Sequence, residues 1–220
     1  EADVMLNMGF KEDLNRILSE TPAEKRSWMF SATMPQDVAR IAKKYMNNPV
    51  EITTGTKNTG NENIEHEFYM VHARDKYAAL KRIADFYPEI FGIVFCRTKI
   101  ETQQIAKALI DDGYNADAIH GDLTQAQRDN VMGRFRNRSI QMLVATDVAA
   151  RGIDVDNVTH VVNYGLPDEP ENYTHRSGRT ARAGKSGICI SIIHMHEKGK
   201  IQHIEKRTGK RFQQKQVPGA

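Results

Sequence analysis

Gly92-Ile-Val-Phe-Cys96 is a short apolar run, followed at once by the polar residues Arg97 and Thr98 and then by a helical pattern over residues 99–112. The run predicts a strand and the pattern after it predicts a helix. A strand followed by a helix is the unit from which parallel sheets are built, because parallel neighbours need a crossover connection. This stretch therefore predicts an α/β fold, provided that the pattern repeats along the chain.

The same alternation continues on both sides of this stretch. Further strands are predicted at residues 67–71, 116–119, 141–145, 159–162 and 188–193. Further helices are predicted at residues 76–85, 125–138 and 170–181. Short strands that alternate with helices predict a doubly wound parallel sheet, covered by helices on both faces.

The chain before residue 63 has a different organisation. It predicts a helix over residues 4–19 broken at Gly9, a short strand over 26–30, a helix over 36–46 and a strand over 50–52. Residues 53–62 are rich in Thr, Gly and Asn and poor in apolar side chains, which favours a linker. We therefore expect a first segment over residues 1–52, a linker over 53–62 and a complete α/β domain over 63–220.

The composition is that of an ordinary globular protein, with 40% hydrophobic and 27% charged residues among 220. No apolar run approaches the roughly 20 residues that cross a bilayer, so no membrane span is expected. Cys96 and Cys189 lie far apart inside apolar runs, which favours two buried thiols in a reducing cytoplasm over a disulfide or a metal site. The net charge of +3 permits nucleic acid as a partner but does not indicate it alone.

Polar residues follow four of the predicted strands at the point where each strand ends. In open α/β sheets ligands bind at the carboxyl ends of the strands, so these residues are expected to converge on one edge. Thr98, Gly121 and Thr146 can each offer a hydroxyl or a backbone N–H group to a phosphate oxygen. Each of them alone could equally be a turn or a helix cap. Together they favour a groove that binds phosphate groups.

Three arginines, Arg176, Arg179 and Arg182, stand three residues apart. On a helix this spacing would stack them along one face, and three arginines together suggest a partner rich in phosphate. The alternative is a solvated basic helix face. Gly184-Lys-Ser186 resembles the end of a P-loop, but the required upstream glycine is absent and no P-loop occurs in these 220 residues. The residues alone thus indicate a phosphate-binding α/β domain without its own P-loop.

Several stretches, in order along the chain, resemble motifs of the DEAD-box RNA helicases, of bacterial type. The matching stretches are Glu1-Ala-Asp3 (the end of the D-E-A-D box), Ser31-Ala-Thr33 (motif III), Ile93-Val-Phe-Cys-Arg-Thr98 (motif IV), His120-Gly-Asp122 with Gln125-x-x-Arg128 and Phe135-Arg136, Ala145-Thr-Asp-Val-Ala-Ala-Arg-Gly-Ile-Asp154 (motif V), the segment from Asp156 to Pro167, and His175-Arg-Ser-Gly-Arg-Thr-Ala-Arg-Ala-Gly184 (motif VI). Two positions depart from the family: Ala181 stands where glycine is frequent and Gly165 where an acidic residue is common.

The resemblance implies a RecA-like helicase C-terminal domain, preceded by the remnant of a first RecA-like domain in residues 1–52. It implies an RNA-dependent ATPase that uses ATP with Mg²⁺ in the cleft between two such domains and that remodels RNA duplexes or RNA–protein complexes. The partners would be single-stranded or short duplex RNA, bound without regard to sequence, and the rest of the first domain. The 220-residue chain alone is expected to be inactive.

The resemblance also implies a role for each matched residue. Arg179 and Arg182 would act as arginine fingers on the nucleotide, and Arg176 would bridge to the first domain near Asp3. The nucleotide ribose would be read at Gly152 and Asp154, Glu1 would orient the attacking water, and Ser31 and Thr33 would link the D-E-A-D box to the interface between the domains. The RNA contacts would come from Arg97, Thr98, Gly121, Gln125, Arg128, Thr146 and Asp147.

Three alternatives stay open at this point. The chain could be a stand-alone module that binds RNA or protein without catalysis. The basic tail could extend the RNA path or form a solvated helix; its cations are Lys198, Lys200, Lys206, Arg207, Lys210 and Arg211. The first segment carries Trp28 and Phe30 but lacks strands to flank them, so we expect it to be buried against a second copy of the chain.

Overall fold

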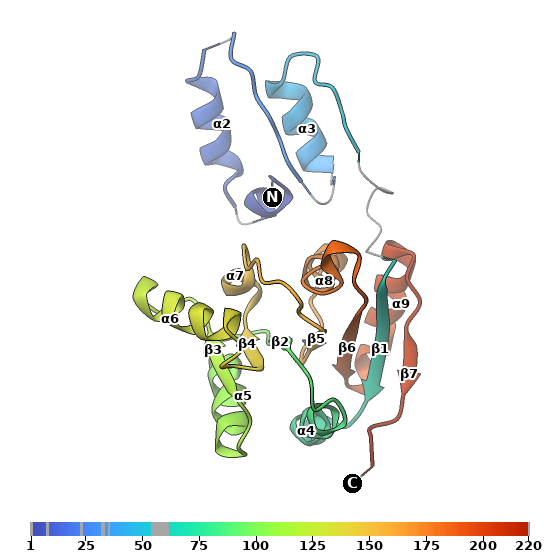
Figure 1. Ribbon diagram of the computed structural model, residues 1–220. Coiled ribbons are helices and arrows are strands. Elements are labelled where there is room, and N and C mark those ends of the chain that lie inside the picture. Colours follow the sequence, from blue (N-terminus) through green and yellow to red (C-terminus); the bar gives the residue numbers. More distant parts are fainter. Residues whose placement is uncertain are drawn as a thin grey trace. The chain divides into compact units, whose positions relative to one another are not determined.

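The computed structural model describes residues 2–7, 9–22, 24–31, 34, 36–53 and 62–219. The chain divides into two compact units, residues 1–59 and 60–220, each of which is considered by itself (Figure 1). The larger unit contains the predicted α/β domain. Most of the predicted linker falls on residues 54–61, which lie outside the described residues.

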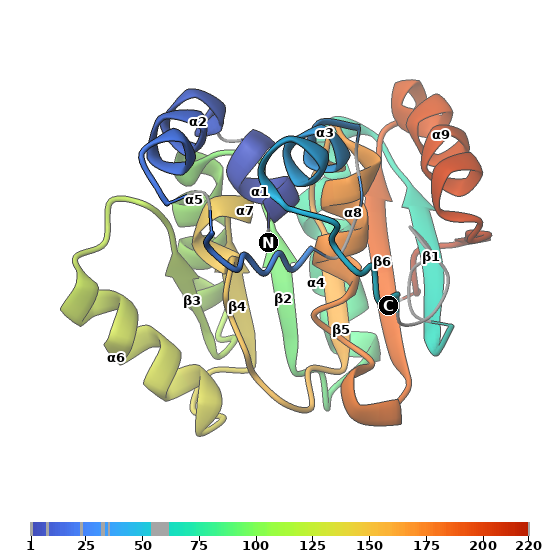
Figure 2. The same ribbon diagram turned by 90° about the horizontal axis from the view of Figure 1, so that it is seen from above.

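The second unit is built on a sheet of seven parallel strands in the order β3-β4-β2-β5-β6-β1-β7. The order from β3 to β1 can be followed across Figure 2, and β7 is seen beside β1 in Figure 1. The strands are β1 (Ile64–Met70), β2 (Gly92–Phe95), β3 (Ala116–Ile119), β4 (Met142–Ala145), β5 (His160–Asn163), β6 (Gly187–Ile193) and β7 (Gln213–Lys215). The inner strands β2, β4 and β5 are buried along their whole length, as expected where both faces of a parallel sheet are covered.

Helices cover both faces of this sheet (Figure 1). One face packs against α4 (Lys76–Phe86) and α5 (Lys99–Asp111). The other packs against α6 (Gln125–Arg136), α7 (Asp147–Ala150), α8 (Pro170–Ser177) and α9 (Lys198–Thr208). Alternate residues of one strand serve the two cores: in β2, Ile93 and Phe95 face α6 and α8, whereas Val94 faces α4 and α5. The predicted doubly wound α/β fold is confirmed.

The predicted boundaries hold within a few residues except at α8. This helix ends at Ser177 with Gly178 as its C-cap, not at residue 181. Arg179 therefore lies beyond the helix, and Arg182 opens a 3₁₀ turn, η2 (Arg182–Gly184), after Ala181 in a left-handed conformation with φ +56°. The prediction of three arginines on one helix face is wrong, because glycine ends the helix between the first and the second of them. Two other 3₁₀ turns are η1 (Ala73–Asp75) and η3 (Met195–Glu197).

The first unit contains α1 (Ala2–Asn7), α2 (Lys11–Ser19) and α3 (Gln36–Tyr45). The break predicted at Gly9 is present, with φ +85°, a value that glycine adopts easily. The strands predicted over residues 26–30 and 50–52 are wrong: both segments lack strand pairing. Within the described part of this unit no neighbouring strand exists to complete a ladder, and the Trp28 side chain is 82% exposed.

Cys96 and Cys189 are both buried and unpaired with each other, as predicted. Burial raises the pKa of both thiols, that of Cys189 to about 12. Among the helices that the structure describes, none combines the length and the apolar character needed to cross a bilayer.

Candidate functional site

The residues predicted to bind phosphate meet at the carboxyl edge of the second unit. Gly121, Thr146 and Thr98 follow β3, β4 and β2, which are consecutive neighbours in the sheet. The Thr98 hydroxyl caps α5 and accepts from the Glu101 N–H group at 3.1 Å, and the Thr146 hydroxyl caps α7 and accepts from the Ala149 N–H group at 3.3 Å. A capping hydroxyl is held in place by this bond but keeps its own proton to donate to a ligand.

The side chains at the start of α6 complete this part of the edge. Gly121 is exposed, and a Cβ atom added there would meet nothing within 4 Å, so its backbone is open to a ligand. Arg128 crosses to α7, where its Nη2 donates to the Ala149 carbonyl at 3.2 Å. Gln125 donates to Asp129 at 2.8 Å. The structure therefore places the predicted RNA-contacting residues of β2, β3, β4, α6 and α7 along one edge.

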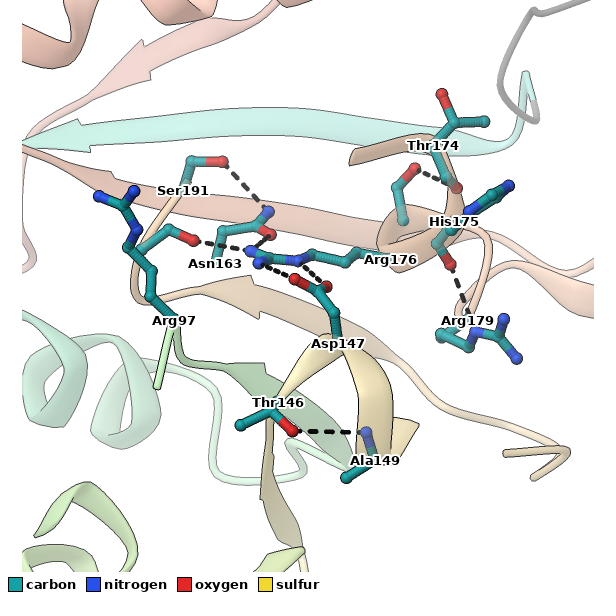
Figure 3. A network of polar contacts seen from close by, with 12 residues as sticks. Arg97, Thr146, Asp147, Ala149, Asn163, Thr174, His175, Arg176, Arg179 and Ser191 are labelled. Atoms are coloured by element: carbon teal, nitrogen blue, oxygen red, sulfur yellow. Dashed lines mark hydrogen bonds and ion pairs between the residues drawn. The ribbon is translucent and has the colours of Figure 1, made fainter. Parts of the chain in front are cut away.

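Arg176 is the best-buried cation of the region, with 2% of the residue exposed. Its Nε and Nη2 donate to the two carboxylate oxygens of Asp147 at 2.5 and 2.7 Å, and its Nη1 donates to Asn163 at 3.0 Å and to the Gly165 carbonyl at 2.6 Å (Figure 3). Asn163 is itself oriented by a bond from its amide to Ser191 at 3.3 Å. Arg176 thus ties α8 to α7 and to the end of β5.

This network bears on two of the predicted roles. Four of the five N–H groups of Arg176 are used inside the second unit, where this arginine holds α8 to α7 and to the end of β5; the bridge towards Asp3 stays a prediction. Asp147 was predicted to contact RNA, but both of its carboxylate oxygens accept from Arg176. An aspartate would in any case repel a phosphate backbone. Asp147 therefore positions Arg176.

Arg179 and Arg182 converge on the turn at Ile153 and Asp154. Nη1 of Arg179 donates to the Ile153 carbonyl at 3.0 Å, and Nη2 of Arg182 donates to the same carbonyl at 3.4 Å. Nη1 of Arg182 also pairs with the carboxylate of Asp154, whose side chain is 87% exposed. Gly152, with φ +69°, makes the turn that brings Asp154 to this place. Two permanent positive charges beside an exposed carboxylate can bind a phosphate and a hydroxyl-bearing sugar.

An aromatic cluster of Tyr173, His66 and Phe212 packs around α8, and no motif in the sequence indicated it. The Tyr173 hydroxyl is 2.6 Å from Nδ1 of His66 on β1, and the Phe212 ring lies 5.4 Å from the His66 ring and 5.1 Å from the Tyr173 ring. Burial lowers the pKa of His66 to about 4, so this histidine is neutral at physiological pH. The only signal in the sequence was an aromatic residue at the start of the arginine-rich stretch.

The first unit contributes one described contact to the predicted site. The backbone N–H of Asp3 donates to the Ser31 hydroxyl at 3.3 Å, and Asp3 is buried. Glu1 and Thr33 lie outside the described residues, so their predicted roles are not addressed by the structure.

The domain has a parallel sheet, polar residues gathered at its carboxyl edge, and two arginines, Arg179 and Arg182, that meet at the Ile153 carbonyl. These features are those of an α/β domain of the RecA-like class. Comparison with known families agrees: a helicase conserved C-terminal domain matches residues 75–184, and a DEAD/DEAH box helicase domain matches residues 1–41. The chain belongs to the DEAD-box helicase family.

Two bacterial relatives match along almost the whole chain. It is 45% identical over 218 residues to the DEAD-box ATP-dependent RNA helicase CshA of Geobacillus kaustophilus, a match that covers 99% of this chain and 47% of that protein. It is 46% identical to the ATP-dependent RNA helicase CshA of Listeria monocytogenes, covering 99% of this chain and 42% of that protein. The chain therefore spans about half the length of the curated relatives that it matches.

Solved structures agree. A DEAD box protein from Methanococcus jannaschii has a TM-score of 0.67 and 45% identity, covering 98% of this chain and 58% of that one. The structure of S. cerevisiae Dbp5 bound to RNA and ADP BeF3 has a TM-score of 0.90 and 30% identity, covering 99% of this chain and 58% of that one.

Proposed function

We propose that this chain is part of an ATP-dependent RNA helicase, in which the second unit supplies two arginines to the nucleotide and one part of the RNA-binding surface. The observation that carries the proposal is the convergence of Arg179 and Arg182 on the Ile153–Asp154 turn, in a chain that is 45% identical to an RNA helicase. RNA, ATP and a cytoplasmic location belong to the same proposal.

The two arginines would act on the phosphates of ATP. Phosphoryl transfer needs little covalent help from the protein, and an arginine that reaches the γ-phosphate raises the rate by about 10³–10⁵, or roughly 4–7 kcal/mol of the barrier. Arg179 donates to the carbonyl oxygens of His175 and Ile153, which carry no net charge. A phosphate accepts a stronger, charge-assisted bond from a guanidinium group than a neutral carbonyl oxygen does.

Asp154 and Arg182 would be released together. The exposed carboxylate of Asp154 pairs with Arg182. A ribose hydroxyl would take the carboxylate while a phosphate takes the guanidinium group. Because an exposed ion pair contributes at most about 1 kcal/mol, it opens at little cost.

The RNA would lie along the carboxyl edge. Its contacts would come from the hydroxyls of Thr98 and Thr146, the open backbone at Gly121, and the side chains of Gln125, Arg128 and Arg97. Contacts of this kind reach the sugar–phosphate backbone and carry no information on the bases, so binding would be independent of sequence. A preference for RNA over DNA would come from contacts to the 2′-hydroxyl group.

Magnesium would accompany ATP, but the described residues do not form a site for it by themselves. They contain no group of three or more His, Cys, Asp or Glu side chains that could hold a metal ion. We therefore assign no step to the ion. The 220 residues also lack a P-loop, so nothing in them would place the β- and γ-phosphates. The chain alone should bind RNA but should not hydrolyse ATP.

The test of the proposal is RNA-stimulated ATP hydrolysis by the complete protein with poly-uridylate. Arg179→Ala should lower turnover by about 10³-fold or more and leave ATP binding nearly unchanged, because the arginine acts on charge in the transition state. Arg134→Ala, which removes an exposed arginine that pairs with Asp117 on β3, serves as the control. An Arg179→Ala variant that keeps more than about a tenth of wild-type turnover would contradict the assignment.

The alternative is a stand-alone module that binds RNA or protein without catalysis. It predicts that Arg179→Ala changes no activity of the complete protein, so the same assay separates the two functions. The predicted dimer through residues 1–52 gains no support from the relatives. The exposed Trp28 and Phe30 side chains satisfy its premise, and light scattering of the purified chain would test it.

A further inference from the structure

The carboxyl edge does not end at β2. Beyond it, β5 and β6 are the next neighbours in the sheet. Asp168 lies in the segment between β5 and α8, and Lys200 lies in the first turn of α9, which follows β6 and η3. Arg97 follows β2 after one intervening residue, Cys96, so the three side chains come from segments that follow three adjacent strands.

These three side chains form one ion cluster. Nη2 of Arg97 donates to both carboxylate oxygens of Asp168, at 3.0 and 2.9 Å, and Nζ of Lys200 donates to Oδ1 of the same carboxylate at 2.7 Å. The bond from Lys200 and the charge of Arg97 lower the pKa of Asp168, so the carboxylate is charged at neutral pH. The side chains of Arg97, Asp168 and Lys200 are 48%, 65% and 40% exposed, so solvent and ligands reach all three.

The Arg97 side chain packs against the backbone at Gly165. Its aliphatic part lies across Gly165, where an added Cβ atom would stand 2.7 Å from Cγ and 3.0 Å from Cδ of Arg97. Figure 3 shows its guanidinium group pointing away from Asp147, whose charge is taken by Arg176. Arg97 is therefore directed along the edge towards Asp168.

We propose that the Arg97–Lys200 pair is a phosphate subsite that extends the RNA-binding edge onto α9, and that Asp168 occupies this subsite as a built-in competitor until RNA displaces it. The proposal rests on the proposed RNA-binding function and adds two residues to it, Lys200 as an RNA contact and Asp168 as an antagonist. A carboxylate that bridges two cations stands in the place of a phosphodiester oxygen pair, which the same guanidinium and ammonium groups recognise. Exposed ion pairs of this type are weak, so a phosphate can replace the carboxylate.

Two substitutions with opposite expected effects test the proposal in the 220-residue chain. Binding of fluorescein-labelled oligo-uridylate is measured by fluorescence anisotropy at several salt concentrations. Asp168→Asn should bind about threefold to tenfold more tightly, because both cations become free for the phosphate. Lys200→Gln should bind more weakly, and the slope of log affinity against log salt should become shallower by about 0.7, the value for one phosphate contact on a single strand.

Each variant has a matched control on the same protein. Asp111→Asn removes an exposed carboxylate that pairs with Lys107 at the far end of α5, and so changes the net charge equally without touching the edge. Lys206→Gln removes a lysine from the last turn of α9. Both controls should leave the affinity and the salt slope within about a factor of 1.5 of wild type, because neither side chain pairs with Arg97, Asp168 or Lys200.

The outcomes separate the subsite from the RNA-binding function itself. If Asp168→Asn gains no more affinity than Asp111→Asn, or Lys200→Gln loses no more than Lys206→Gln, the subsite does not exist. If these pairs are indistinguishable while Arg128→Gln weakens binding, RNA still lies on the edge and only the extension to α9 is overturned. If the wild-type chain does not bind oligo-uridylate at any salt concentration, the RNA-binding function and the subsite both fall.

Discussion

Asp147→Asn should destabilise the second unit far more than a comparable change at an exposed ion pair. It leaves the guanidinium group of Arg176 buried, 2% exposed, without the charge that it pairs with at 2.5 and 2.7 Å. Breaking a buried pair from one side costs about 3–5 kcal/mol. The Asp147 side chain is 31% exposed, and Asn163 and the Gly165 carbonyl still accept from Arg176, so we expect the lower end, about 3 kcal/mol.

The comparison is Asp154→Asn, which removes the same charge from the pair with Arg182. The Asp154 side chain is 87% exposed, so its pair should contribute less than about 1 kcal/mol. For a unit of this size 1 kcal/mol shifts the melting temperature by about 2–4 °C. Asp147→Asn should therefore melt about 6–12 °C below wild type and Asp154→Asn within about 4 °C of it.

The assay is thermal unfolding followed by far-UV circular dichroism. Asp147→Asn should lower the melting temperature by about 6–12 °C and Asp154→Asn by no more than about 4 °C. Equal shifts for Asp147→Asn and Asp154→Asn would refute the claim that burial distinguishes the two pairs.

Three further outcomes are expected. Burial lowers the pKa of both His66 and His160 from 6.5 to about 4, so the unfolded chain takes up protons before the folded chain does. The free energy of unfolding should therefore fall as the pH drops from about 6.5 to about 4. In urea titrations, His160→Gln should make that fall shallower, and an unchanged fall would contradict the prediction. Gly165→Ala should displace Arg97 and weaken oligo-uridylate binding about twofold to threefold, whereas Gly133→Ala, with open space around the added methyl group, should not; equal affinities would show that the position of Arg97 is unimportant. Neither thiol should react with a disulfide reagent at pH 8 in the native chain, because burial raises the pKa of Cys96 and Cys189, and both should react in urea; rapid native reaction would argue against their burial.

The sequence predicted the sheet well because its inner strands are apolar runs with few competing signals. It missed α7 (Asp147–Ala150), since four residues are too short to show a helical period, and β7 (Gln213–Lys215), whose exposed polar residues lack the strand pattern. The strand predicted at residues 26–30 failed for another reason. A strand needs a partner strand, and the described residues of the first unit contain none.

The sequence also predicted one part of the candidate site and could not predict another. The residues after β2, β3 and β4 converge because the order of parallel strands fixes where their carboxyl ends lie. The spacing of Arg176, Arg179 and Arg182 could not show that the first is buried and the other two are not. Their difference depends on where α8 ends and on Asp147, which is distant in sequence. The end of α8 could have been predicted from Gly178, because glycine commonly ends helices.

The ion pair between Asp147 and Arg176 joins the helices α7 and α8. Thr146, which we propose contacts RNA, is the covalent neighbour of Asp147. Arg179, which we propose contacts the nucleotide, lies three residues after Arg176 and beyond the end of α8. Two short charged bonds hold α7 to α8. We expect RNA bound at Thr146 to shift the guanidinium group of Arg179. A single buried ion pair would then couple the binding of RNA to the binding of the nucleotide.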